Sequence, residues 1–169
     1  MRRALDGLFD CAAWGAALLM VGTLVMVVLG MLDRYVSISF RGTDMYAGYC
    51  MAGAGFLALA HTLKKNEHIR VTLLLNALSA GPKRAMEVWS LCAAVFLSGL
   101  FCYYSIRLSY QSWDFNDIST GNDATPLWIP QIGMALGTLV LLIAFVDELV
   151  LELRGLRSVA ESEEALHNE

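Results

Sequence analysis

The sequence predicts an all-α integral membrane protein with four transmembrane helices, an interfacial amphipathic helix between the second and third, and both termini in the cytoplasm. Apolar residues make up 57% of the 169-residue chain and charged residues 17%, below the ~25% typical of soluble proteins. The apolar residues also gather in four runs without a charge, each near the ~20 residues that cross a bilayer as a helix. Backbone groups in lipid must be satisfied within the segment, so we expect four helices in a single membrane domain, 1–169.

The first run covers residues 11–32, between Asp10 and Asp33. Arg2 and Arg3 precede it, as they would precede the apolar part of a signal peptide. The run is too long for that role, and no Ala-x-Ala cleavage site closes it. We therefore predict a retained span.

The second run, 45–63, is the least apolar of the four. Gly48, Ala52 and Gly55 recur in it at i, i+4 and i+7, and the fourth run, 126–146, holds Gly133 and Gly137 as a G-x-x-x-G pair. Small residues let helices in a membrane approach closely. These positions are predicted helix-packing sites. They either join the four helices of this chain or receive a partner protein, and the sequence leaves both open.

The segment 67–80 (EHIRVTLLLNALSA) separates the second run from the third, 88–106. As a helix it would be about 21 Å long, which is too short to cross a membrane. Its polar residues form one narrow stripe and leucines fill most of the rest. This pattern predicts an amphipathic helix lying on the cytoplasmic interface. Gly81-Pro82 is expected to end it and to set up the third span.

The loop before the fourth run is acidic and contains Asp114 and Asp117. It is either a solvated connection or a docking surface for an external partner. Pro126 and Pro130 mark where the last span begins, because proline suits the first turn of a helix and disrupts its interior. Beyond Val146 the chain becomes polar and acidic, which predicts a cytoplasmic tail over 150–169.

The basic residues predict the orientation. Cytoplasmic loops are enriched in Lys and Arg, and nine of the twelve basic residues lie at the amino terminus, between the second and third runs, or in the tail. The other three, on the opposite side, are Arg34, Arg41 and Arg107. Trp14 and Trp89 fall at the predicted cytoplasmic boundary, where amphipathic rings prefer to sit.

Several functions are disfavoured by what the sequence lacks. The net charge is −4 and no basic patch is interleaved with aromatic residues, so we expect no nucleic-acid binding. None of the four runs contains an ionisable Asp, Glu, Lys or Arg, although transporters keep such groups within the membrane to hold substrate or ions. The four cysteines show no C-x-x-C spacing, and His61 alone lies near a span, too few histidines for bis-histidine haem. We predict a scaffold that has no cofactor or metal and is not an enzyme.

Four features in order along the chain carry a family resemblance: residues 33–35 (DRY), Asp44, residues 64–71 (KKNEHIRV) and residues 125–130 (TPLWIP). Over essentially its whole length the chain resembles the small membrane subunit, DctQ-like, of tripartite ATP-independent periplasmic (TRAP) transporters. The resemblance implies a bacterial inner-membrane protein paired with a large multi-span subunit that holds the substrate and sodium sites. A periplasmic binding protein would deliver a small organic acid, and this chain would brace the large subunit.

The resemblance also suggests residue roles. Arg34 and Asp44 would pair at the outer boundary or meet the binding protein. Glu67 and His68 would shape the turn from the second span into the interfacial helix. Anchoring to phospholipid head groups falls to Lys64, Lys65 and Arg70, unless these three only reflect the positive-inside rule. Two alternatives stay open: a small self-contained transporter that dimerises through Gly133 and Gly137, and a membrane anchor of a redox enzyme.

Overall fold

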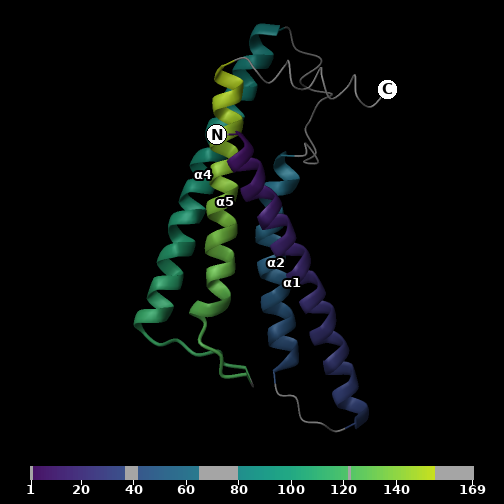
Figure 1. Cartoon of the computed structure of the whole chain (residues 1–169). Helices are drawn as coiled ribbons and strands as arrows, with labels where there is room; N and C mark the ends of the chain where they lie inside the picture. The colour runs from purple at the N-terminus through teal and green to yellow at the C-terminus, as the bar shows by residue number, and fades with distance from the viewer. Residues whose placement is uncertain (1, 37–41, 65–79, 122, 155–169) are drawn as a thin grey trace, which may run out of the picture.

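A computed structural model of the chain describes residues 2–36, 42–64, 80–121 and 123–154, and these residues form four helices (Figure 1). The helices are α1 (Arg2–Val36), α2 (Thr43–Lys64), α4 (Ala80–Asp114) and α5 (Trp128–Leu153). The predicted apolar runs lie in these helices, the first two residues of the fourth run excepted. Residues 67–79 of the predicted interfacial helix, and the tail beyond Arg154, lie outside the described residues.

Three of the helices contain segments long and apolar enough to cross a membrane: Leu5–Asp33 in α1, Arg84–Asp114 in α4, and all of α5. The shorter α2 carries glycines, tyrosines and His61 among its apolar residues, so its crossing remains a prediction. α1 and α4 have 35 residues each, about 52 Å of helix against ~30 Å of hydrocarbon. The charge-free runs therefore mark the lipid-facing middle of these helices and not their ends.

Gly81 and Pro82 lie in the first turn of α4, which is described from Ala80 onward. This fits their predicted role in setting up the third span, while the interfacial helix that they were expected to end lies outside the described residues. The first four N–H groups of a helix have no partner within it, so proline loses no hydrogen bond there.

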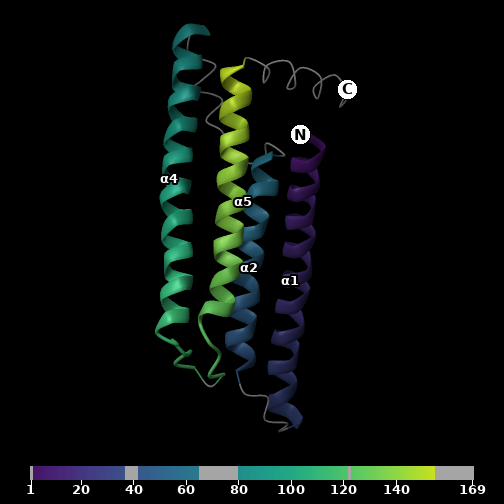
Figure 2. The ribbon, with the colours of Figure 1, turned by 60° about the vertical axis from the view of Figure 1, so that its left-hand side comes forward.

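The helices form an open row in the order α1, α2, α5, α4 (Figures 1 and 2). α1 packs on α2, α2 on α5, and α5 on α4, while α1 meets α5 much less, around Phe9 near its own start. We call the end with the 115–127 connection the loop end, and the end with Arg2 and Leu153 the terminal end. The two central helices, α2 and α5, both run from the loop end to the terminal end.

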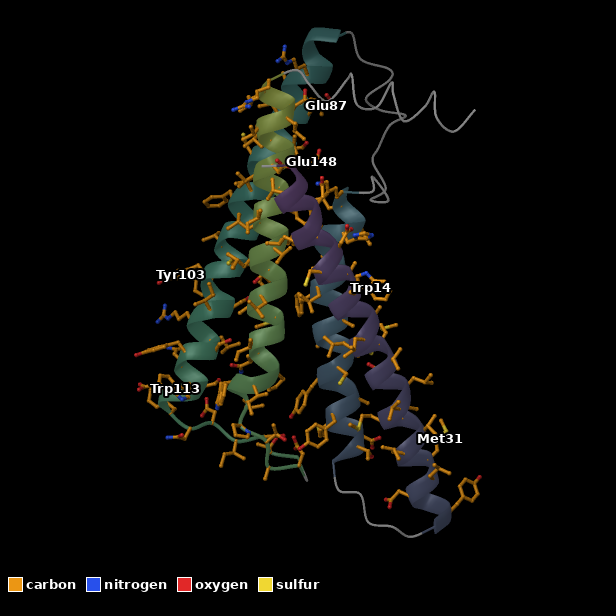
Figure 3. All side chains as sticks on the ribbon, viewed as in Figure 1. Trp14, Met31, Glu87, Tyr103, Trp113 and Glu148 are labelled. Atoms are coloured by element: carbon orange, nitrogen blue, oxygen red, sulfur yellow. The ribbon has the colours of Figure 1, made fainter. Side chains whose placement is uncertain are left out.

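The core is small and lies near the terminal end, where α1, α2 and α5 converge. Its buried cluster consists of Phe9, Ala60, Leu63, Leu141 and Ala144. Large apolar side chains elsewhere on α1 and α4 are mostly exposed, and Figure 3 shows Trp14, Tyr103 and Trp113 pointing outward. An exposed apolar surface of this extent needs lipid or protein to cover it, as expected of a multi-pass membrane protein.

Glycines form the seam between α2 and α5. A Cβ at Gly133 would lie 3.5 Å from the Cα of Gly53, and one at Gly137 would lie 2.6 Å from the carbonyl carbon of Phe56. No side chain fits at Gly137 unless the helices separate. This close approach places the G-x-x-x-G pair of α5 directly against α2.

Small polar residues line the inner face of α4. Ser98, Ser105 and Ser112 recur every seven residues and are all buried, with Cys102 between them. On α5, Thr138 is buried as well. Ser98 and Thr138 each donate their hydroxyl proton to a carbonyl oxygen one turn back in their own helix, at 3.1 and 3.0 Å. Small polar residues whose hydroxyl groups are hydrogen-bonded within their own helix allow the close helix approach seen in membrane proteins.

Candidate functional site

The connection between α4 and α5 folds over the start of α2 at the loop end. The Tyr49 hydroxyl lies 3.1 Å from a carboxylate oxygen of Asp123 and 3.0 Å from the Ser119 hydroxyl, which itself donates to Asp123 at 2.7 Å. Beside them, Thr125 donates to the Tyr46 hydroxyl at 2.9 Å. The bonds of the two tyrosines join residues that lie 70 to 79 positions apart in the chain, and so attach the connection to α2.

The Asp123 carboxylate is stabilised in its charged form. The hydrogen bond from Ser119 is the largest cause that lowers the pKa of this carboxyl below its ordinary value, with smaller contributions from Thr125 and Tyr49. Hydrogen bonds donated to a carboxylate favour ionisation. Gly42 closes the same site: its φ is +85°, and a Cβ there would lie 2.6 Å from the Cβ of Asp123. Glycine is needed both for that backbone conformation and for the close approach.

The two predicted loop carboxylates are exposed on a backbone held in place. Asp114 is the last residue of α4, and Asp117 follows in the connection; both are exposed. The Asp117 N–H donates to the Ser112 carbonyl, and its own carbonyl accepts from the Leu127 N–H, both at 3.0 Å. The carboxylates therefore face outward from an ordered loop.

Asp44 lies exposed in the first turn of α2, where a negative charge interacts favourably with the helix dipole. It sits next to α1, since a Cβ at Gly30 would lie 3.7 Å from one of its carboxylate oxygens. The Arg34 side chain is outside the described part of the structure, so the Arg34–Asp44 pair remains a prediction.

Lys64 is engaged within the chain. At the terminal end it forms an ion pair with Asp6 of α1, and its ammonium nitrogen lies 4.6 Å from the centre of the Phe9 ring. These contacts tie the end of α2 to the start of α1. Lys65, Glu67, His68 and Arg70 lie outside the described residues.

The two tryptophans expected at the cytoplasmic boundary face outward. Trp14 on α1 is 78% exposed and Trp89 on α4 is 74% exposed. Both rings are available to lipid. Figure 3 shows Trp14 projecting away from the neighbouring helices.

The small residues of α2 singled out from the sequence do not pack against the described residues of the other helices. Gly48, Ala52 and Gly55 are exposed, and no heavy atom lies within 4 Å of a Cβ placed at either glycine. A different face of α2 makes the contacts, with Gly53 against α1 and α5. α2 thus has small residues on more than one face, and the alternative that Gly48, Ala52 and Gly55 receive a partner protein stays a prediction.

The two prolines mark the entry to α5. Pro126 forms an isolated antiparallel bridge with Ile118 across the connection. Pro130 lies in the first turn of α5, which begins at Trp128. Both positions avoid the helix interior, where proline would remove a hydrogen bond.

Sequence reasoning missed two groups of residues: the Tyr49, Ser119 and Asp123 network, and the buried serines of α4. The seven-residue spacing of Ser98, Ser105 and Ser112 was a usable signal for one face of a helix. The network had no such signal, since its members come from distant parts of the chain. Among the residues the structure describes, no three or more His, Cys, Asp or Glu side chains gather as metal ligands.

Residues 23–155 match the family model of the DctQ component of tripartite ATP-independent periplasmic transporters. The chain belongs to this family. A DctQ component is the small permease subunit of a TRAP transporter and not an enzyme, so a redox-enzyme anchor is excluded. Membership in the DctQ family implies partnership with a large membrane subunit and a periplasmic binding protein. No curated protein matches the chain closely enough to add to this.

Proposed function

We propose that this chain is the fixed scaffold of a sodium-driven TRAP transporter that imports a small organic acid, and that it braces the large transport subunit. In this proposal it lies in the bacterial inner membrane with α2 as a fourth span. The terminal end faces the cytoplasm and the loop end faces the periplasm. The excess of Lys and Arg on the cytoplasmic side supports this orientation.

The open row of helices carries the proposal. Holding a charged solute or its coupling ion at membrane depth requires ionisable groups there, and the four apolar runs contain no Asp, Glu, Lys or Arg. Exposed apolar faces extend along both edge helices instead. This arrangement offers contact area to a larger partner, and the partner would bind the substrate.

The loop end suits the docking of the binding protein. Asp44, Asp114 and Asp117 expose three carboxylates there, and the Asp123 network holds the connection that carries Asp117. Complementary charge steers association and sets orientation, so the docking face of the binding protein should carry Lys or Arg. Trp14 and Trp89, together with Lys65 and Arg70, would anchor the opposite end among phospholipid head groups.

Uptake by reconstituted components tests the scaffold role. The purified chain alone in liposomes is expected to move no solute under a sodium gradient, because it lacks a site for substrate or ion. Adding the large subunit and the binding protein should give sodium-dependent uptake of an organic acid. Uptake by the small chain alone, above that of empty liposomes, would overturn the assignment.

A further inference from the structure

A surface groove of about 310 Å³ lies between α1 and α2 toward the terminal end. It is lined by Asp10, Ala13, Trp14 and Ala17 of α1 and by His61 of α2. The volume falls at the lower end of the ~300–1,000 Å³ range of small-molecule sites. The groove therefore has room for a polar head group and the first part of a chain.

Two polar side chains in the groove have no partner within the described chain. Neither Asp10 nor His61 makes a hydrogen bond or ion pair with another described residue. One turn earlier on α1, by contrast, Asp6 is paired with Lys64. The groove thus presents a hydrogen-bond acceptor from one helix and an imidazole N–H from the next, both available to a ligand.

The rest of the groove is apolar and leads along α1 toward the middle of the helix. Ala13 and Ala17 line it one turn apart, and the exposed ring of Trp14 lies between them in sequence. Asp10 borders the charge-free run of α1, so the polar mouth lies at the level of the lipid head groups. The alanines lie deeper. A ligand that matches this gradient has a polar head and an apolar tail.

We propose that the groove binds one phospholipid with a zwitterionic, primary-ammonium head group, as in phosphatidylethanolamine. The ammonium donates to the Asp10 carboxylate, the His61 N–H donates to the phosphate, and an acyl chain lies over Ala13 and Ala17 beside Trp14. This inference goes beyond the proposed scaffold role and does not depend on it.

The lining selects among lipid classes. An anionic head group such as phosphatidylglycerol would bring its charge next to Asp10 without an ammonium to offset it. A quaternary ammonium cannot donate a hydrogen bond to the carboxylate, and it prefers a cage of several aromatic rings. Among the described residues that line this groove, Trp14 is the one with an aromatic ring. A primary ammonium satisfies Asp10 and leaves the phosphate for His61.

Native mass spectrometry of the purified full-length chain in mild detergent tests this proposal. The chain would be titrated with phosphatidylethanolamine, phosphatidylglycerol and phosphatidylcholine of identical acyl chains. One phosphatidylethanolamine should bind about tenfold or more tightly than either of the others, since a charge-assisted hydrogen bond is at stake. Asp10→Asn should reduce that preference about tenfold, and Asp10→Glu should largely restore it.

Two further variants complete the test. Asp114→Asn, an exposed carboxylate at the opposite end, should leave lipid binding unchanged. Ala17→Phe fills the apolar part of the groove and should weaken the binding of phosphatidylethanolamine without touching its polar mouth, so the proposal stays testable even if Asp10→Asn fails to fold. Equal binding of all three lipids, or full binding by Ala17→Phe, would overturn it. Uptake experiments bear on the scaffold role separately, because lipid binding needs only this chain.

Discussion

Gly137 and Gly55 lie on adjacent helices in opposite surroundings. A Cβ at Gly137 would be 2.6 Å from the backbone of Phe56, whereas a Cβ at Gly55 would meet nothing within 4 Å. Rigid backbone atoms cannot yield as the end of a flexible side chain can. The same substitution should therefore have opposite consequences at the two positions.

Gly137→Ala is expected to destabilise the protein by about 1–3 kcal/mol, the usual cost of overpacking a close contact. Gly55→Ala is the matched control and should be neutral or slightly stabilising, because alanine is the better helix former. Thermal unfolding in the same detergent measures both. Equal midpoints for the two variants would contradict the packing of α5 on α2.

Asp123 makes a prediction about pH. The pKa of Asp123 is lower in the folded protein than in the unfolded chain. The network therefore stabilises the connection fully at pH values above the pKa of the unfolded chain. It loses this effect as the pH falls through the pKa of the folded protein. The connection should stay attached to α2 from pH 8 to 5 and loosen only below about pH 4. Hydrogen exchange of residues 115–127 measures this.

Ser119→Ala supplies the comparison for the pH experiment. It removes the strongest hydrogen bond to Asp123, so exchange in the connection should be faster already at pH 7. Loosening of the original protein between pH 5 and 7 would show that another group holds the connection.

At the scale of the elements, α2 carries the open question of the topology. Its glycines and tyrosines leave it without a stretch as apolar as the candidate spans of the other three helices, yet it occupies the centre of the row between α1 and α5. A helix packed on both sides depends less on lipid, and so it needs less apolar surface. This packing supports the proposal that α2 is a fourth span.

Labelling of single cysteines from either side of the membrane tests whether α2 crosses. In a background without the four native cysteines, Asp44→Cys at the start of α2 should react with an impermeant maleimide added outside spheroplasts. Arg84→Cys, exposed near the start of α4, should react only after permeabilisation, because the positive-inside rule places it in the cytoplasm. Labelling of both positions from outside would mean that α2 does not cross.

The helices could be predicted and their neighbours could not. Charge-free length alone located four helices, since lipid demands internally satisfied backbone groups. Lipid is as apolar as leucine, however, so the contact face of a helix leaves little hydrophobic pattern. Gly53 and Gly55 look alike in the sequence, yet Gly53 is buried in the seam and Gly55 is exposed. The acidic character of the loop could be predicted from its composition. The Tyr49–Asp123 contact could not, because it joins residues 74 positions apart.

At the scale of the whole molecule, two antiparallel hairpins, α1 with α2 and α4 with α5, meet along one seam (Figure 2). The connection between α4 and α5 crosses from the second hairpin to the first through Tyr49 and Tyr46. The loop end is thus one continuous surface built from both hairpins, and Asp44 and Asp117 belong to it together.

Reversing charge on that surface tests docking of the binding protein. Asp114→Lys combined with Asp117→Lys should weaken its binding to the assembled transporter about tenfold or more, mainly by slowing association, because steering by charge acts on the approach. Glu87→Lys, a charge change of the same sign near the terminal end (Figure 3), is the control and should leave binding unchanged. Unaltered affinity in the double variant would reject the loop end as the contact.

The single seam has a consequence for how this protein evolves. At positions that face away from the neighbouring helices, valine, leucine and phenylalanine can replace one another, because the position only has to stay apolar. Gly137 allows no such exchange, because a Cβ there would lie 2.6 Å from a backbone atom of Phe56. Distant homologues should therefore share the positions of such glycines more than they share sequence identity along their helices.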